Sequence, residues 1–255
     1  MCIRDRARIL MQTGNTDDAI TLLLDRPSSG KYYPFYYLDY LSGLAKLNRL
    51  DDDTDRYFLK FTTNFRGSNY IKSAYQKMAW KALLDHDTIN YYRNMSMVLK
   101  YGADIADGDK MAMAEALDVP IPNKCLLSAR LLYDGGYYHQ ADSVLSHTSC
   151  LYRNDREKLE RSYRQGRIAQ ALEKDDEALR YYEQTILLGQ DENYYFAANA
   201  ALQSGRIYEK NGDHGNAESS YHVCLEMKYD EYKNSISQKA KAGLNRIKEI
   251  KETDD

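Results

Sequence analysis

The stretch GRIYEKNGDHGNAESSY, from Gly205 to Tyr221, decides the fold class of this 255-residue chain. It opens with a small residue, Gly205, places Ala217 twelve positions later, and places Tyr221 four positions beyond that. Gly212 and Asp213 stand between the two small residues and mark a turn. Two helices joined by a tight turn pack antiparallel, and small residues let them approach closely where they cross. We therefore predict a helical hairpin in which the Tyr221 ring fills the space beside the crossing.

The same order of small residue, turn, alanine and bulky residue occurs three more times. The further sets are Ala7, Ala19 and Leu23; Ala129, Ala141 and Leu145; and Gly166, Ala178 and Tyr182. One hairpin cannot bury its own apolar faces, so such hairpins stack. Only four prolines and fourteen glycines interrupt the chain, which favours long helices. The predicted fold is all-α, an α-α superhelix of about six stacked helical hairpins.

The middle of the chain keeps a helical periodicity but loses the small-residue rule. The expected sets there are Gly43, Asp55 and Leu59, followed by Gln76, Thr88 and Tyr92. Leading residues lie 33 to 39 positions apart, except for 53 between Gln76 and Ala129, which indicates an insertion. The insertion maps to YGADIADGDKMAMAEALDVPIPN, in which residues 109–117 are predicted to form one extra helix and Pro120 and Pro122 break the chain.

Four parts of the chain follow from these patterns. Residues 1–100 hold degenerate hairpins, 101–122 the insertion and a hinge, 123–231 the regular repeats, and 232–255 a polar capping helix. The opening residues Met1 to Arg6 resemble the adapter-derived start of some metagenomic gene calls. We therefore expect the native N-terminus, with any export signal, to lie upstream. The compartment stays open between cytoplasm and periplasm.

The hairpin pattern resembles the tetratricopeptide repeat family. Gly205, Tyr208, Ala217 and Tyr221 match the family pattern fully, whereas a second repeat carries Ala169 at the aromatic place. The Trp and the closing Pro of the family pattern are absent. The resemblance implies a scaffold that binds a protein or peptide in a concave groove lined by the first helix of each repeat.

Two further stretches carry weaker resemblances. FLKFTTNFRGSNYIKSAYQKMAWKALL, residues 58–84, is similar to repeats of bacterial outer-membrane assembly lipoproteins and cell-envelope coordinators. It implies an alternative role as a periplasmic or outer-membrane-associated lipoprotein in an envelope assembly machine. YKNSISQKAKAGLNRIK, residues 232–248, resembles the end of repeat proteins from Bacteroidetes-like bacteria, which suggests an origin and not an activity.

Neither the net charge nor the sequence motifs indicate nucleic-acid binding, a membrane span, a metal site or catalysis. The net charge of −3 gives no reason to expect binding to nucleic-acid phosphates, and no apolar run has the length of a membrane helix. The cysteines form no CxxC pair, and the histidines show no metal-ligand spacing. Asp104, Asp107 and Asp109 lack the rest of a calcium loop and are predicted to lie in a solvated loop. No phosphate-binding loop or nucleophile motif occurs, so we predict no enzyme, no cofactor and no metal.

The candidate binding residues follow the leading small residues. The next residues along the chain are Arg8, Leu44, Lys77, Arg130, Arg167 and Arg206, five of which are basic. Such a row along a groove would suit the carboxylates of an acidic partner or a free C-terminus. The alternative is internal pairing, of Arg130 with Asp134 and of Arg206 with Glu209.

A second candidate is the aromatic run from Tyr32 to Tyr37, with Tyr40, because consecutive helical positions cannot all face one core. Tyr36 and Tyr37 are its candidate contact residues. Burial against the neighbouring hairpin is the alternative.

Overall fold

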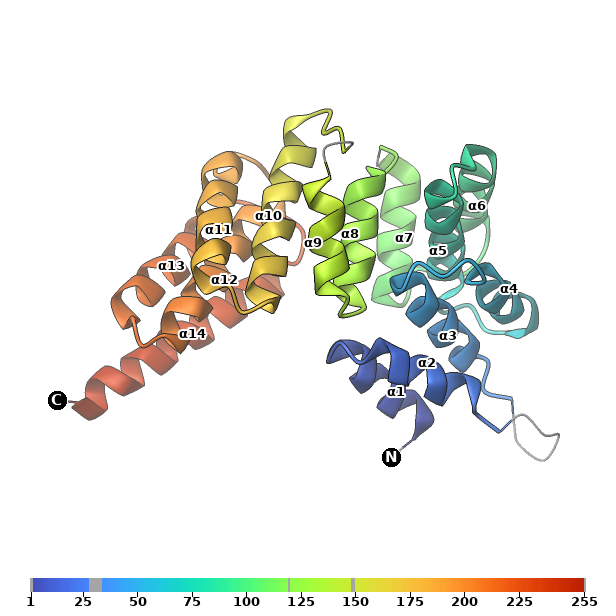
Figure 1. Cartoon of the computed structure of the whole chain (residues 1–255), viewed down its shortest axis with the longest axis horizontal. Helices are drawn as coiled ribbons and strands as arrows, with labels where there is room; N and C mark the ends of the chain where they lie inside the picture. Colours follow the sequence, from blue (N-terminus) through green and yellow to red (C-terminus); the bar gives the residue numbers. More distant parts are fainter. Residues whose placement is uncertain (1, 28–33, 119, 148–149, 255) are drawn as a thin grey trace. The chain divides into compact units, whose positions relative to one another are not determined.

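A computed structural model describes residues 2–27, 34–118, 120–147 and 150–254. These residues form helices and no strand, which confirms the predicted all-α class (Figure 1). The helices are α1 (Ile3–Gln12), α2 (Thr16–Leu24), α3 (Tyr37–Asn48), α4 (Asp55–Asn64), α5 (Ile71–Leu84), α6 (Thr88–Lys100), α7 (Asp107–Asp118), α8 (Lys124–Asp134), α9 (Tyr138–Ser146), α10 (Asp155–Ala171), α11 (Asp175–Gly189), α12 (Tyr195–Lys210), α13 (His214–Glu226) and α14 (Lys233–Asp254).

Two compact units make up the chain, unit 1 at Met1–Val144 and unit 2 at Leu145–Asp255. In unit 1, α1 packs on α2, α3 on α4, and α5 on α6, while α7 packs on both α5 and α6. In unit 2, α10 packs on α11, α12 on α13, and α14 on both α12 and α13. Helix α7 is the predicted extra helix. The four-part division of the chain stays a prediction, since the two units divide between Val144 and Leu145.

One backbone motif ends the first helix of each of the six hairpins found among the described residues. In each hairpin, the residue seven positions after the leading small residue has a positive φ. The backbone N–H of the following residue donates a hydrogen bond to the carbonyl of the residue that stands three positions after the leading one. The six positive-φ residues are Gly14, Leu50, His86, Gly136, Glu173 and Gly212. The six hydrogen bonds measure between 2.8 and 3.0 Å. A left-handed residue closed by such a bond is a standard helix C-cap, which explains why glycine recurs there.

This motif corrects the register of the third hairpin. His86 has φ +65°, and Asp87 N–H donates to the Ala82 carbonyl, so the leading residue is Ala79 and not Gln76. Sixteen residues after Ala79, at the place of the bulky residue, comes Met95, which is buried, whereas Tyr92, which was predicted at this place, is 59% exposed. The sequence rule failed because it took the wrong turn of the helix as the crossing point.

The second hairpin begins its second helix late. Helix α4 begins twelve residues after Gly43, whereas the other five second helices begin nine residues after their leading residue. A Cβ at Gly43 would lie 2.9 Å from the Phe58 ring, so Phe58 fills the crossing. The predicted Leu59 is 59% exposed.

Unit 2 shows the crossing most clearly. A Cβ at Gly166 would lie 2.5 Å from the Tyr182 ring, and a Cβ at Gly205 would lie 2.5 Å from the Tyr221 ring. On α14, Gly243 approaches Tyr221 equally closely, with its Cβ position 2.4 Å from the ring. Two glycines on two helices therefore confine the fully buried Tyr221 ring.

The insertion is part of the core of unit 1. Asp109 on α7 is fully buried, and its carboxylate accepts hydrogen bonds from the backbone N–H groups of Tyr70 (2.6 Å) and Ser73 (2.9 Å). A carboxylate at this position caps the first turn of α5. The prediction of a solvated loop is therefore wrong for Asp109, although Asp107 is exposed.

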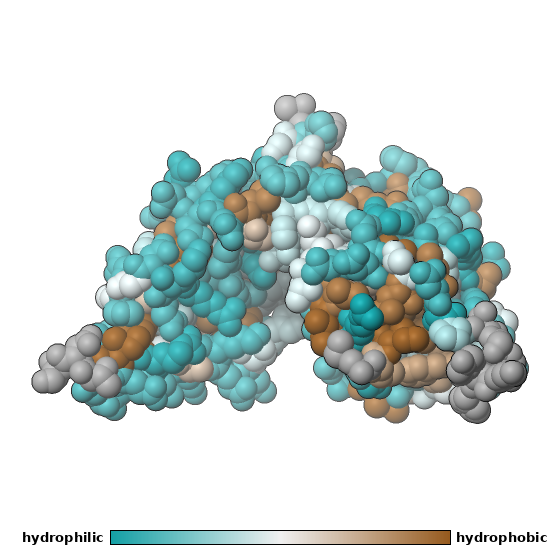
Figure 2. All heavy atoms as spheres, turned by 60° about the horizontal axis from the view of Figure 1, so that its bottom comes forward, coloured by the Kyte–Doolittle hydropathy of each residue, from teal (hydrophilic) through white to brown (hydrophobic). Residues whose placement is uncertain are grey.

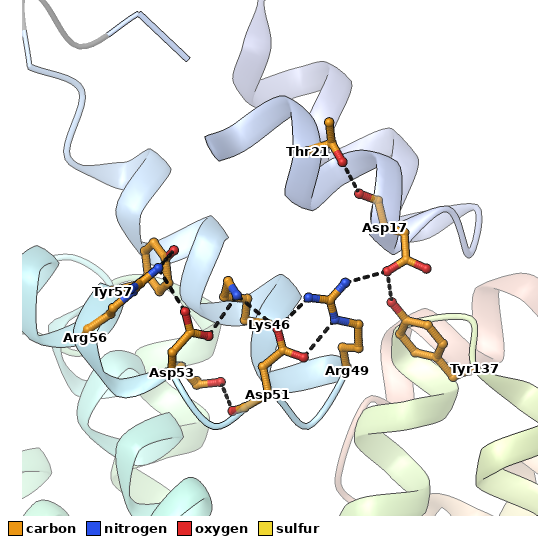
Figure 3. A network of polar contacts seen from close by, with 10 residues as sticks. Asp17, Thr21, Lys46, Arg49, Asp51, Asp53, Arg56, Tyr57 and Tyr137 are labelled. Carbon is orange, nitrogen blue, oxygen red and sulfur yellow. Dashed lines mark hydrogen bonds and ion pairs between the residues drawn. The ribbon is translucent and has the colours of Figure 1, made fainter. Parts of the chain in front are cut away.

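Within unit 1 the turns of the first and fourth hairpins meet. A Cβ at Gly136 would lie 2.4 Å from the backbone of Gly14. Figure 3 shows the polar network beside this contact, in which the Asp17 carboxylate accepts from Arg49 (2.8 Å) and from the Tyr137 hydroxyl (2.9 Å). Hairpins distant in sequence therefore hold each other in place within this unit.

Candidate partner-binding face

Helices α10 and α12 of unit 2 lie against each other and carry two of the candidate arginines. Asn154 caps α10 by accepting the Glu157 N–H at 2.9 Å, and alanines let α12 pack closely into the unit. Arg167 on α10 is half-buried, and Arg206 on α12 is exposed. Both arginines follow a glycine at which a tyrosine ring crosses, so the hairpin contacts fix their positions.

A chain of hydrogen bonds links these two arginines across α10 and α12. Arg167 donates to the Tyr163 hydroxyl at 3.0 Å, and the Asn199 amide donates to the same oxygen at 2.8 Å. The Gln203 amide donates to the Asn199 oxygen at 3.0 Å. Arg206 donates to the Gln203 oxygen at 3.5 Å, the long end of the hydrogen-bond range. We call these five side chains the donor row.

Arg206 does not make the internal ion pair that the sequence offered it. Glu209 instead accepts two hydrogen bonds from Arg246 on α14, at 2.6 and 2.9 Å, and one from the Tyr221 hydroxyl at 2.5 Å. The Arg246 hydrogen bond is the main cause that lowers the pKa of Glu209 below its usual range. Because Glu209 is engaged there, the charge of Arg206 stays exposed at the end of the donor row.

The other two candidates meet at Trp80 in unit 1. The Lys77 Nζ lies 3.4 Å from the centre of the Trp80 ring, and the Arg130 guanidinium lies 5.1 Å from it. The indole N–H donates to Glu115 of α7 at 2.8 Å. Arg130 also pairs with Asp134 at 3.9 Å, the internal partner named for it above. Burial, and secondly Arg130, lower the pKa of Lys77 to about 7.

The structure changes the membership of the predicted basic row. Because Ala79 leads the third hairpin, Trp80 and not Lys77 stands at the equivalent place. Leu44 is half-buried in the core of unit 1 and Arg8 is exposed on α1. The candidates thus form two local groups, one in each unit. We call the group in unit 1 the Trp80 cluster; it consists of Lys77, Trp80, Glu115, Arg130 and Asp134. The group in unit 2 is the donor row.

The aromatic candidates pack largely against each other. Tyr37 lies 5.5 Å from Tyr40 and 4.7 Å from Tyr70, measured between ring centres. Tyr40 is buried, and its hydroxyl lies 2.8 Å from the Ser73 hydroxyl. Tyr36 is half-buried in the same core. Tyr36, Tyr37 and Tyr40 thus pack against the core of unit 1, while Tyr32 and Tyr33 lie outside the described residues.

The surface beside these tyrosines is apolar. Figure 2 shows hydrophobic side chains gathered on the face of unit 1 that carries α1 and α2. Ile9, Leu24 and Phe35 are exposed by 47%, 46% and 46% in this part of the chain.

Three members of the donor row, Tyr163, Asn199 and Gln203, were not predicted from the sequence. Tyr163 stands four residues before Arg167, Asn199 seven before Arg206, and Gln203 three before it. These are helical spacings, so each residue shares a face with its arginine. That signal was present in the sequence, but it marks a site only once α10 and α12 are known to be adjacent.

Other kinds of site find no support in the described ranges. There, no three His, Cys, Asp or Glu side chains cluster as metal ligands would. None of the helices described has both the length and the apolar character needed to cross a membrane.

Comparison with known proteins agrees with the hairpin geometry. A family model described as tetratricopeptide repeat matches residues 200–233, which covers most of α12, the turn and α13. None of the curated proteins compared with the chain matches it. The match supports a tetratricopeptide repeat protein, and such repeats generally form non-enzymatic scaffolds for protein–protein interaction.

Proposed function

We propose that this chain is a scaffold that binds an acidic segment of a protein partner along the donor row of unit 2. The observation that carries the proposal is the linked set of side chains across α10 and α12 with an arginine at each end. A guanidinium binds carboxylates through charge-assisted hydrogen bonds, which are stronger than neutral ones. Arg206 keeps its charge exposed because Arg246 and Tyr221 engage Glu209.

The Trp80 cluster supports such binding less well. Its cations, Lys77 and Arg130, stand beside the carboxylates of Glu115 and Asp134. The cluster is thus close to neutral, and an acidic partner would compete with carboxylates already present. Lys77, Arg130, Tyr36 and Tyr37 stay predictions as contact residues, as do the alternative envelope role and the Bacteroidetes-like origin.

The test uses the full chain and an array of short Glu- and Asp-containing peptides, each with its Gln or Asn counterpart. The variant carries Arg167→Gln and Arg206→Gln. The matched control carries Arg180→Gln and Lys239→Gln, two exposed residues of unit 2 outside the donor row. Both variants lose the same formal charge.

We expect wild type and control to bind a subset of acidic peptides and the donor-row variant to bind them at least about tenfold more weakly. Added salt should weaken the wild-type interaction. Equal weakening in control and donor-row variants would show that only net charge matters, and would contradict the proposal. Binding unchanged by Arg167→Gln and Arg206→Gln would contradict it as well.

A further inference from the structure

In the donor row each hydrogen bond leads toward the Tyr163 hydroxyl. A guanidinium has donors and no acceptor, so Gln203 must present its oxygen to Arg206. The Gln203 NH₂ then donates to the Asn199 oxygen, and the Asn199 NH₂ in turn donates to Tyr163. At the other end Arg167 also donates to Tyr163, and it cannot do otherwise. The hydrogen bonds that run from Arg206 through Gln203 and Asn199, and the hydrogen bond from Arg167, therefore all lead to one oxygen.

That oxygen belongs to the Tyr163 hydroxyl, which keeps a donor of its own. A hydroxyl has two acceptor lone pairs and one O–H. Arg167 and Asn199 occupy the two lone pairs at 3.0 and 2.8 Å. The Tyr163 proton cannot point toward either of them, since both present hydrogens. Among the contacts of the described residues, none supplies an acceptor for this proton.

Packing holds the hydroxyl in this place. The Tyr163 ring is buried and lies 5.9 Å from the Tyr195 ring and 5.3 Å from the Phe196 ring, between centres. Tyr163 is 4% exposed, and Arg167 and Asn199 beside its hydroxyl are half-buried. A rigid ring with a defined O–H direction is pre-organised to donate to a ligand.

We propose that Tyr163 is the specificity-determining donor of the row, and that its O–H binds a carboxylate oxygen of the partner next to the Arg167 guanidinium. This inference rests on the function proposed above, and it names the group within the site that distinguishes a carboxylate from an amide. Both oxygens of a carboxylate can accept hydrogen bonds from the donors of the row. A side-chain amide has one such oxygen, and its NH₂ group, which is itself a donor, would have to lie beside those donors. The site should therefore distinguish Glu or Asp from Gln or Asn. Asn199 and Gln203 act as positioning residues.

The test uses the acidic peptide from the array that binds the wild-type chain most tightly, together with its amide counterpart. Isothermal titration calorimetry compares wild type, Tyr163→Phe and Tyr181→Phe. The control removes a hydroxyl from α11 that contacts Gln165 at 3.5 Å and lies outside the donor row. Circular dichroism checks that each variant keeps its helices. Protein labelled with ¹³C at the tyrosine ring carbon bonded to the hydroxyl oxygen reports directly on the hydroxyl.

We expect Tyr163→Phe to bind the acidic peptide about tenfold or more weakly while binding the amide peptide nearly as wild type does. The Tyr163 ¹³C signal should shift on addition of the acidic peptide, and Tyr181→Phe should behave as wild type. Tyr163→Phe that binds the acidic peptide as tightly as wild type, or an unshifted signal, would overturn the proposal. A failure of the proposed function can be distinguished from these results, because the wild-type chain itself would then bind no acidic peptide. That result would overturn the inference too.

Discussion

Replacement of Gly205 by alanine tests the crossing on which the hairpin depends. In the middle of a helix this change normally stabilises a protein by about 0.5–1 kcal/mol, because alanine is the better helix former. Here the new methyl group would lie 2.5 Å from the Tyr221 ring. The ring cannot retreat, because Gly243 approaches it from α14. Overpacking of this kind costs about 1–3 kcal/mol, so we expect a net loss of up to about 2.5 kcal/mol.

The chain offers a matched control in Gly215→Ala. Gly215 lies on α13 of the same unit, and the nearest atom to its Cβ position is 3.9 Å away. This variant should gain about 0.5 kcal/mol from helix propensity. Urea denaturation followed by circular dichroism measures both changes, and hydrogen exchange on peptides from α12, α13 and α14 locates them. If Gly205→Ala proved as stable as Gly215→Ala, the close crossing of Tyr221 at Gly205 would be refuted.

Three further predictions follow from the caps and the buried charges. Glu173→Gly should stabilise the chain by about 0.5–1 kcal/mol in urea denaturation, because Glu173 has φ +59°, a conformation that favours glycine. Gly212→Ala, at the equivalent position of the next hairpin, should destabilise the chain. If Glu173→Gly destabilised the chain and Gly212→Ala stabilised it, the helix C-cap that these hairpins share would be contradicted. Asp109→Ala should cost about 1 kcal/mol through loss of the α5 cap, measured by urea denaturation with Trp80 fluorescence, while Asp107→Ala should cost almost nothing. One lysine should titrate near pH 7 in NMR of ¹³C-dimethylated lysines, because the pKa of Lys77 is lowered from 10.5 to about 7, and Arg130→Gln should raise that pKa. Since the native state then binds fewer protons than the unfolded state between pH 7 and 10.5, this group adds stability as pH rises through that window; no lysine titrating below pH 9 would contradict the prediction.

Much of the fold was predictable because a helical hairpin repeats one physical solution. Gly166 and Gly205 each stand sixteen residues before the tyrosine that crosses them, and the structure confirms both crossings. The rule failed where the connection changed. Helix α4 begins late after Gly43, so Phe58 replaced Leu59 at the crossing. In the third hairpin Ala79 was one of several small residues on α5, and the sequence alone did not select it.

The donor row was less predictable than the fold. Arg167 and Arg206 could be found from their place in the repeat, but Tyr163 and Asn199 become partners only when α10 and α12 are adjacent. Likewise, the pairing of Arg206 with Glu209 was a sound local expectation. It fails because α14, which is distant in sequence, brings Arg246 to Glu209. Contacts between helices, and not spacing along one helix, decide which charges stay exposed.

The central claim is that unit 2 holds an acidic segment along α10 and α12. Its most direct test is photo-crosslinking of the full chain with an acidic peptide that binds it, carrying benzoylphenylalanine beside the acidic residue, followed by mass spectrometry of the crosslinked site. We predict crosslinks within α10 and α12 close to Arg167, Asn199 and Arg206, which disappear when excess unlabelled peptide competes. Competed crosslinks confined to α13, α14 or unit 1 would contradict the account.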